Sequence, residues 1–222
     1  MILYHFLEAK WALEAIKNQR LKVSNFKSLN DPFELLHLSL KDKDMRTVMQ
    51  QNKNRLSETF RLLCFSERWD SPVQWGHYAN NHKGLVLQFN IDDSLVEEVR
   101  YKKNRPQLKI DKLFAESNEN TAKLIKRIMT TKYIDWSYEE EWRMILMKKE
   151  IYSDNNLEFI DFNELFQLTA VIKGSLNDTS NSEIKNYLPI QKSLKIIQAR
   201  NAFNSYRIVR DRNKPIHNLA KA

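Results

Sequence analysis

The sequence predicts one α+β domain with a mixed or antiparallel sheet and flanking helices. Two patterns in its 222 residues support this fold class. Short apolar runs typical of strands alternate irregularly with longer segments whose apolar residues recur every three or four positions, as in helices. The chain also has no internal repeat and no linker rich in Gly, Pro or Ser, and 42% of its residues are hydrophobic. We therefore expect residues 1–222 to fold as a single domain.

The N-terminal part of the chain contains a regular succession of strand and helix patterns. We expect strands at 1–6, 21–24, 62–65 and 85–89, and helices at 9–19, 41–60 and 72–79. The first helix has one apolar face, the second is mostly polar and reads as a surface helix, and Pro72 opens the third. Between the first and second of these helices, the Asn, Asp and Pro of 28–33 predict a loop.

The C-terminal part continues the mixture. We expect strands at 99–102, 142–147, 168–173 and 206–209, and helices at 116–132 and 182–188. The helix at 116–132 is predicted by Ala122, Ile125, Ile128 and Met129, which share one helical face.

The positive charge is concentrated at the C-terminus. The formal net charge is +8, and the basic C-terminal segment 192–222 carries +7 of it. A polyanionic partner such as nucleic acid would meet this segment first, through Arg207, Arg210, Arg212 and Lys214. The alternative is a solvated end that only aids solubility.

Several common classes of protein are excluded by what the sequence lacks. The single cysteine, Cys64, permits no intramolecular disulfide, and no apolar run approaches the roughly 20 residues of a membrane span. Charged residues interrupt the N-terminal apolar stretch where a signal peptide would be continuous. We expect a cytoplasmic protein without a membrane partner.

With three glycines in all, the chain has no P-loop and no GxGxxG turn, and it lacks HExxH, CxxC and GxSxG.

Two aromatic-acidic clusters indicate a binding site. The first, within 64–89, contains Trp75, His77, Tyr78, His82 and Lys83. Helical spacing predicts that Trp75 and Tyr78 form one aromatic wall, with His77 turned about 100° away. The two histidines are five residues apart without an acidic or thiol ligand at suitable spacing, so we expect no metal. Alternatively, the two aromatic residues belong to the core and the histidines to the surface.

The second cluster, within 136–147, places three glutamates directly before a strand. Alternation along that strand puts Glu141 beside Arg143, and both are candidate catalytic residues. A carboxylate next to an arginine can hold a ribose hydroxyl or stabilise a cationic transition state during cleavage of a glycosidic bond. The alternative is a surface ion pair. His5, on the first strand, faces away from its neighbours Tyr4 and Phe6 and is more often structural than a ligand in such a place.

Six segments of the chain resemble a bacterial family catalogued as domain of unknown function 2971. They are LYHF at 3–6, SLNDPFE at 28–34, CFSE at 64–67, WGHYA at 75–79, HKG at 82–84 and YEEEWR at 138–143. This resemblance implies kinship of fold rather than an activity.

More distantly, the order of elements resembles the ADP-ribosyltransferase fold, which includes toxins that modify DNA bases. In that fold a histidine on the first strand contacts the adenosine ribose of NAD, a central aromatic residue stacks on nicotinamide, and a glutamate on a later strand contacts the nicotinamide ribose. The matching residues here are His5, Tyr78 and Glu141. Tyr78 departs from the pattern, because it lies on a predicted helix where the fold often has a strand, and Trp75 is nearby.

The resemblance implies NAD as cofactor, with a site formed by both clusters. Glu141 would polarise the ribose 2′-hydroxyl, and Arg143 would bind phosphate or orient Glu141. The implied NAD-binding residues are His5, Trp75, His77, Tyr78, His82 and Lys83. An enzyme of this kind would be a bacterial toxin or phage-defence effector that modifies nucleic acid or protein, with an antitoxin or defence protein as partner.

Two other functions stay open from the sequence. The first is a non-catalytic module that binds a nucleotide or nucleic acid through the aromatic cluster and the basic segment. The second is a Mg²⁺-dependent nuclease that uses Asp135 and the acidic run 139–141.

Overall fold

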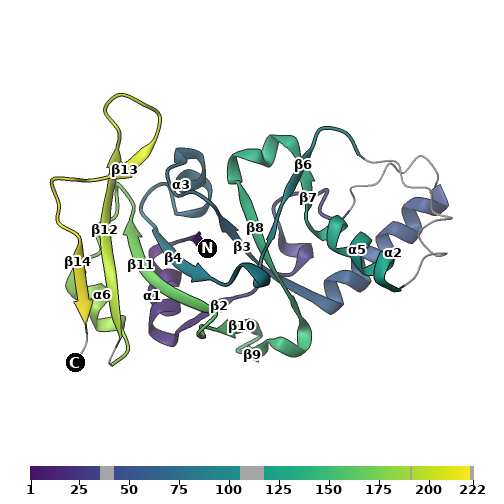
Figure 1. Cartoon of the computed structure of the whole chain (residues 1–222), viewed down its shortest axis with the longest axis horizontal. Helices are drawn as coiled ribbons and strands as arrows, with labels where there is room; N and C mark the ends of the chain where they lie inside the picture. Colours follow the sequence, from purple (N-terminus) through teal and green to yellow (C-terminus); the bar gives the residue numbers. More distant parts are fainter. Residues whose placement is uncertain (36–42, 106–117, 191, 221–222) are drawn as a thin grey trace.

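The computed structural model describes residues 1–35, 43–105, 118–190 and 192–220, and Figure 1 shows their arrangement. Nine strands of this part of the chain form one sheet. Along the sheet they are β13 (Ile208–Arg210), β12 (Ser193–Asn201), β11 (Phe166–Lys173), β4 (Leu85–Ile91), β1 (Ile2–Leu7), β3 (Phe60–Ser66), β8 (Glu141–Met147) and β5 (Glu97–Glu98), and β14 (His217–Ala220) also pairs with β12. The β11–β12 pair is parallel and the others are antiparallel. The predicted α+β class with a mixed sheet is confirmed.

Two small sheets lie beside the large one. One contains β2 (Arg20–Lys22), β10 (Leu157–Asp161) and β9 (Tyr152–Asp154), and the other pairs β6 (Arg100–Lys102) with β7 (Thr131–Tyr133) in parallel. The α-helices are α1 (Ala9–Asn18), α2 (Lys43–Thr59), α3 (Pro72–Tyr78), α5 (Asn118–Met129) and α6 (Asn181–Tyr187). Short 3₁₀ helices are η1 (Phe26–Ser28), η2 (Asp93–Leu95), η3 (Ile134–Glu139) and η4 (Lys148–Glu150).

The large sheet is covered on both faces. In β4, Leu85 and Leu87 point into the main core with the buried face of α1, while Val86 points to the other face and packs with Trp75 of α3. The same alternation separates Leu63 of β3 from Leu62, which packs with the end of α5. The second face therefore carries two small apolar clusters, one under α3 and one near α5. In Figure 1, α2 and α5 lie together at one end and β12–β14 at the other.

Several predicted elements differ from the structure. The helix predicted at 116–132 ends at Met129, because the hydroxyls of Thr130 and Thr131 bond back to carbonyls of its last turns and the chain then continues as β7. The predicted starts of two helices, 41–42 and 116–117, lie outside the described residues. Strands β5, β7, β9, β10, β12 and β14 are additional to those predicted.

The basic C-terminal segment is part of the sheet. Through residue 220 it forms β12, β13 and β14, and the side chains of Leu194, Ile196, Ala199 and Ile208 are buried. Its basic residues alternate with these apolar ones, so its charge is displayed from a folded surface.

Candidate functional site

A cavity of about 270 Å³ opens between α3, η3 and the strands β1, β3 and β8. Its wall is aromatic in part, with Tyr4, Phe6, Phe65 and Tyr78. Its charged residues are Lys132, Glu139, Glu141 and Arg143. Strand pairing explains this gathering, because Tyr4 lies opposite Ser66, Ser66 opposite Glu141, and Cys64 opposite Arg143. Residues on three neighbouring strands thus share one face of the sheet.

A fully buried arginine forms the floor of this cavity. Arg143 donates from Nε and Nη2 to the two oxygens of Glu141 at 2.8 and 3.1 Å. It also forms a bidentate pair with Glu34 at 2.5 and 3.0 Å and donates to the Met129 carbonyl. The prediction that Glu141 and Arg143 lie side by side is confirmed, and the alternative of a surface pair is wrong because both are buried. With its donors engaged, Arg143 orients Glu141.

Lys132 lies between two glutamates of the cavity. Its ammonium group donates to Glu139 at 2.5 Å and to Glu141 at 3.2 Å. Although burial alone would raise the pKa of Glu141, the charges of Arg143 and Lys132 lower it to about 2. Burial raises the pKa of Glu139 above its ordinary value, against the opposing charge of Lys132. The site therefore contains two carboxyl groups whose pKa values are displaced in opposite directions, as in many acid-base sites.

Tyr78 connects this charged group to the cavity mouth. Its hydroxyl donates to Glu139 and accepts from the Asn30 side chain. Burial and then the nearby charge of Glu139 raise the pKa of Tyr78, so it stays protonated and acts as a donor. Asn30 belongs to the predicted loop, which contributes Ser28, Leu29 and Asn30 to the cavity lining.

His5 reaches the cavity where β1 and β3 diverge. The two strands pair at Tyr4 and Ser66, and Nδ1 of His5 lies 2.7 Å from the Cys64 carbonyl oxygen. A carbonyl only accepts, so Nδ1 carries the proton and Nε2 remains an acceptor. Burial lowers the pKa of His5, which favours the neutral ring. Burial raises the pKa of the neighbouring Cys64 thiol and keeps it protonated.

Gln74, on α3, is a cavity residue that the sequence did not single out. Its Nε2 donates to the carbonyl oxygens of Tyr138 and Glu139 at 2.9 and 2.7 Å and to Ser66 at 3.1 Å. These acceptors fix which end of the amide is nitrogen. Its Oε1 is buried and has no hydrogen-bond partner within the described part of the chain.

The acidic run before β8 separates in two directions. The backbone of Glu140 is left-handed, with φ 42°, at the end of η3. This turn directs Glu139 into the cavity and Glu140 outward to Arg68, and β8 then begins at Glu141. Asp135 is exposed. The sequence shows the three consecutive glutamates but not the left-handed turn at Glu140 that separates their side chains.

Four of the predicted NAD-binding residues lie outside the cavity. Trp75 is fully buried in the core under α3 and donates to the Trp69 carbonyl, so the predicted aromatic wall of Trp75 and Tyr78 is wrong. His77 is exposed and bonds to Tyr138, and Lys83 is exposed. His82 stacks on Trp75 and borders a different pocket. The alternative, that Trp75 is a core residue and His77 a surface residue, is confirmed for these two.

The basic residues Arg207, Arg210, Arg212 and Lys214 are exposed at the β12–β14 end of the molecule.

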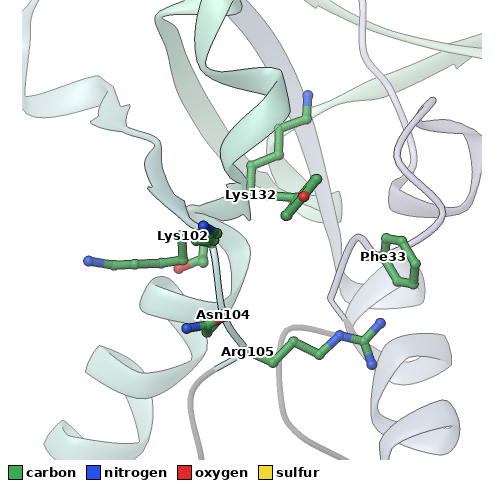
Figure 2. Close-up of a pocket in the computed structure, with 8 residues that line it drawn as sticks. Phe33, Lys102, Asn104, Arg105 and Lys132 are labelled. Carbon is green, nitrogen blue, oxygen red and sulfur yellow. The ribbon is translucent and has the colours of Figure 1, made fainter.

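A second pocket of about 220 Å³ shares Lys132 with the cavity. In Figure 2, Arg105 extends toward the ring of Phe33 and Lys102 extends the other way. The Lys132 ammonium is bonded to Glu139 of the cavity. Because these three basic side chains diverge, the cavity is the better candidate site.

The described residues contain no group of three or more His, Cys, Asp or Glu side chains that could hold a metal ion. None of their helices has the length and hydropathy of a membrane span.

Comparison with known proteins gives one match. Residues 74–144, about a third of the chain, match the model of the family described as Protein of unknown function (DUF2971). This stretch runs from Gln74 of α3 to Met144 of β8 and includes Tyr78, Glu139 and Glu141. The resemblance to this family is supported over that stretch. No curated protein and no solved structure matches the chain.

Proposed function

We propose that this chain is an ADP-ribosyltransferase-like enzyme that binds NAD in the cavity and cleaves the bond between nicotinamide and ribose. The observation that carries the proposal is that His5, Tyr78 and Glu141, three residues far apart in the sequence, line one cavity. These are the residues that the resemblance to the ADP-ribosyltransferase fold selects.

The size and lining of the cavity suit one end of the dinucleotide. Its volume of about 270 Å³ lies just below the range of about 300–1,000 Å³ typical of sites for whole drug-sized ligands. It would hold nicotinamide and its ribose, with the rest of NAD outside. The ring of Tyr78 offers a stacking surface for the nicotinamide ring.

The electrostatics suit an oxocarbenium-like transition state. As the bond between ribose C1′ and the nicotinamide nitrogen breaks, its electron pair goes to the ring nitrogen and neutral nicotinamide leaves. Glu141 is ionised, since its pKa is about 2, and its negative charge stabilises the positive charge that develops on the ribose. Its contacts with Arg143 and Lys132 keep it in place, so no reorganisation is needed.

Glu139 is suited to the second half of the reaction. When the acceptor forms its bond to C1′, it loses a proton, and a carboxylate with a raised pKa is a better base than one with an ordinary pKa. Lys132 and Tyr78 hold Glu139 by hydrogen bonds from both sides. We assign charge stabilisation to Glu141 and proton transfer to Glu139.

The geometry favours the other two functions less. For a Mg²⁺-dependent nuclease, Glu139 and Glu141 would have to share a metal, but the Lys132 ammonium already lies between them. A non-catalytic module needs no pair of carboxyl groups with opposite pKa displacements, but only an activity assay separates it from an enzyme.

The test is release of nicotinamide from NAD, measured by chromatography. We expect Glu141→Gln to lower the rate by roughly a hundredfold or more, as for loss of a charge-stabilising group. Glu140→Gln is the matched control, because Glu140 points away to Arg68, and it should react like the wild type. Thermal unfolding checks that each variant is folded. Because Glu141 is buried, Tyr78→Phe provides a milder second variant that should also slow release. Wild-type protein without release, or Glu141→Gln at full rate, would overturn the proposal.

A further inference from the structure

The hairpin between β12 and β13 carries two aromatic side chains almost wholly in solvent. Phe203 is 89% exposed and Tyr206 is 98% exposed. Figure 1 shows this hairpin projecting from the end of the molecule that is remote from α2 and α5. Exposing two large rings on one short loop gives no benefit to folding, and such a patch marks a binding surface.

Two arginines lie next to these rings, and two more follow in the chain. The guanidinium of Arg200 lies over the ring of Phe203, 4.1 Å from its centroid. Arg207 follows Tyr206 in the loop, and Arg210 and Arg212 are exposed just beyond it. Two acids temper this charge: Asp70 is 3.5 Å from Arg207, and Asp211 is 4.0 Å from Arg200. The segment remains strongly basic, since Asp211 is its one acid.

A pocket of about 530 Å³ lies at the base of the same hairpin. Pro72 and His82 border it on one side and the loop residues from Asn201 to Ile208 on the other. The ring of His82 is nearly parallel to that of Trp75, with an interplanar angle of 11° and ring centroids 6.3 Å apart. The pocket thus lies next to the exposed aromatic residues, with the His82 ring at its border. Its volume is in the range of small-ligand sites.

We propose that this hairpin binds single-stranded nucleic acid. Phe203 and Tyr206 would stack on unpaired bases, and Arg200, Arg207, Arg210 and Arg212 would contact phosphates. Aromatic rings amid arginines are the combination that single-stranded sites use, since every base has a flat face and every linkage a charge. A duplex hides those faces, so it would meet only the charge. The other loop residues are Ala202 and the polar Asn201, Asn204 and Ser205, a poor surface for an apolar protein groove.

This inference does not depend on the NAD chemistry. The hairpin and the cavity share no lining residue. Loss of nucleic-acid binding therefore leaves the proposed enzyme intact, and absence of nicotinamide release leaves the nucleic-acid surface intact.

The test is fluorescence anisotropy of the full chain with a labelled single-stranded oligonucleotide of mixed sequence and with its blunt duplex. We expect tighter binding of the single strand and at least a tenfold loss in the double variant Phe203→Ala/Tyr206→Ala, because stacking contributes about 1–3 kcal/mol per base. Trp11→Ala is the matched control. Trp11 lies on α1, is 51% exposed and has the basic residue Lys10 beside its ring. Its loss should leave the affinity for the oligonucleotide unchanged.

A second variant tests the charges. Arg210→Gln/Arg212→Gln should weaken binding and make it less steeply dependent on salt. The proposal is overturned if the wild type binds neither nucleic acid, if it prefers the duplex, or if the aromatic double variant binds as tightly as Trp11→Ala. All these side chains are exposed, and an unchanged thermal unfolding curve would show that each variant is folded.

Discussion

At the scale of single residues, buried charge determines both the stability and the chemistry of the site. Glu34, Glu141 and Arg143 are buried together, and the arginine offsets what would be a large cost for two buried carboxylates. Lys132 does the same for the pair of Glu139 and Glu141. The proposed catalytic carboxylate is therefore also a structural group, and its variants must be tested for folding as well as for turnover.

The low pKa of Glu141 predicts how stability depends on pH. Its pKa falls from an ordinary 4.5 to about 2 on folding. Ionised Glu141 thus stabilises the fold fully above pH about 4.5, and this contribution is lost as the pH falls toward 2. We expect the difference in unfolding free energy between wild type and Glu141→Gln, measured with urea, to narrow from pH 5 to pH 3. The difference for Glu140→Gln should stay small throughout. A gap for Glu141→Gln that is constant or widens in acid would contradict the assigned charge state.

The sequence predicted part of this site for a physical reason. Strand alternation is short-range, so it was enough to place Glu141 beside Arg143. Lys132 was assigned to a helix, and its place between two glutamates depends on β7 and η3, which no local pattern revealed. Trp75 and Tyr78 lie on the same short helix, but the sheet beneath it buries the first and leaves the second at the cavity. That difference depends on tertiary packing.

At the scale of elements, close backbone contacts fix α3 against the sheet. Gly84 joins the end of the α3 loop to β4, and a Cβ atom there would lie 2.2 Å from the Leu7 carbonyl oxygen and 2.8 Å from the backbone of Ala79. Glycine alone fits this junction. The loop carries three residues with positive φ, Asn80, Asn81 and His82, which turn the chain back toward β4.

Two glycine substitutions test this packing as a matched pair. Gly84→Ala should lower the free energy of unfolding by about 1–3 kcal/mol, because the backbone around it must move. In Gly76→Ala, the added methyl group meets no atom within 4 Å. Since Gly76 lies inside α3, this change should stabilise the protein by up to about 1 kcal/mol. Urea denaturation of both variants measures the difference. Equal effects would contradict the close approach at Gly84.

Strands were predicted where their apolar residues are contiguous and missed where charges interrupt them. The buried runs of β3, β4, β8 and β11 gave clear patterns. In β12, apolar residues alternate with Lys195 and with polar side chains, and the positive charge of the segment dominated its interpretation. Alternation of apolar and polar residues is typical of a strand with one exposed face, and it could have predicted β12 from the sequence.

At the scale of the whole molecule, the basic segment belongs to the fold. β12 pairs in parallel with β11 and antiparallel with β13 and β14, and its inward residues are buried. Positive charge on a fixed strand surface presents arginines at set positions, as the proposed nucleic-acid surface requires.

Removal of residues 192–222 tests this integration. We expect the shortened chain to lose cooperative thermal unfolding, because it exposes the β11 edge and the apolar residues that β12 covers. Circular dichroism with heating measures this loss. If the shortened chain unfolds at the wild-type temperature, the segment does not contribute to the stability of the fold, and this prediction is wrong.

Binding of NAD by calorimetry tests the central claim most directly, with Tyr78→Ala and His77→Ala beside the wild type. The two substituted residues are neighbours on α3, but Tyr78 lines the cavity and His77 is exposed outside it. The account predicts saturable binding by the wild type and by His77→Ala, and its loss in Tyr78→Ala. No binding by the wild type at millimolar NAD, or undiminished binding by Tyr78→Ala, would contradict it.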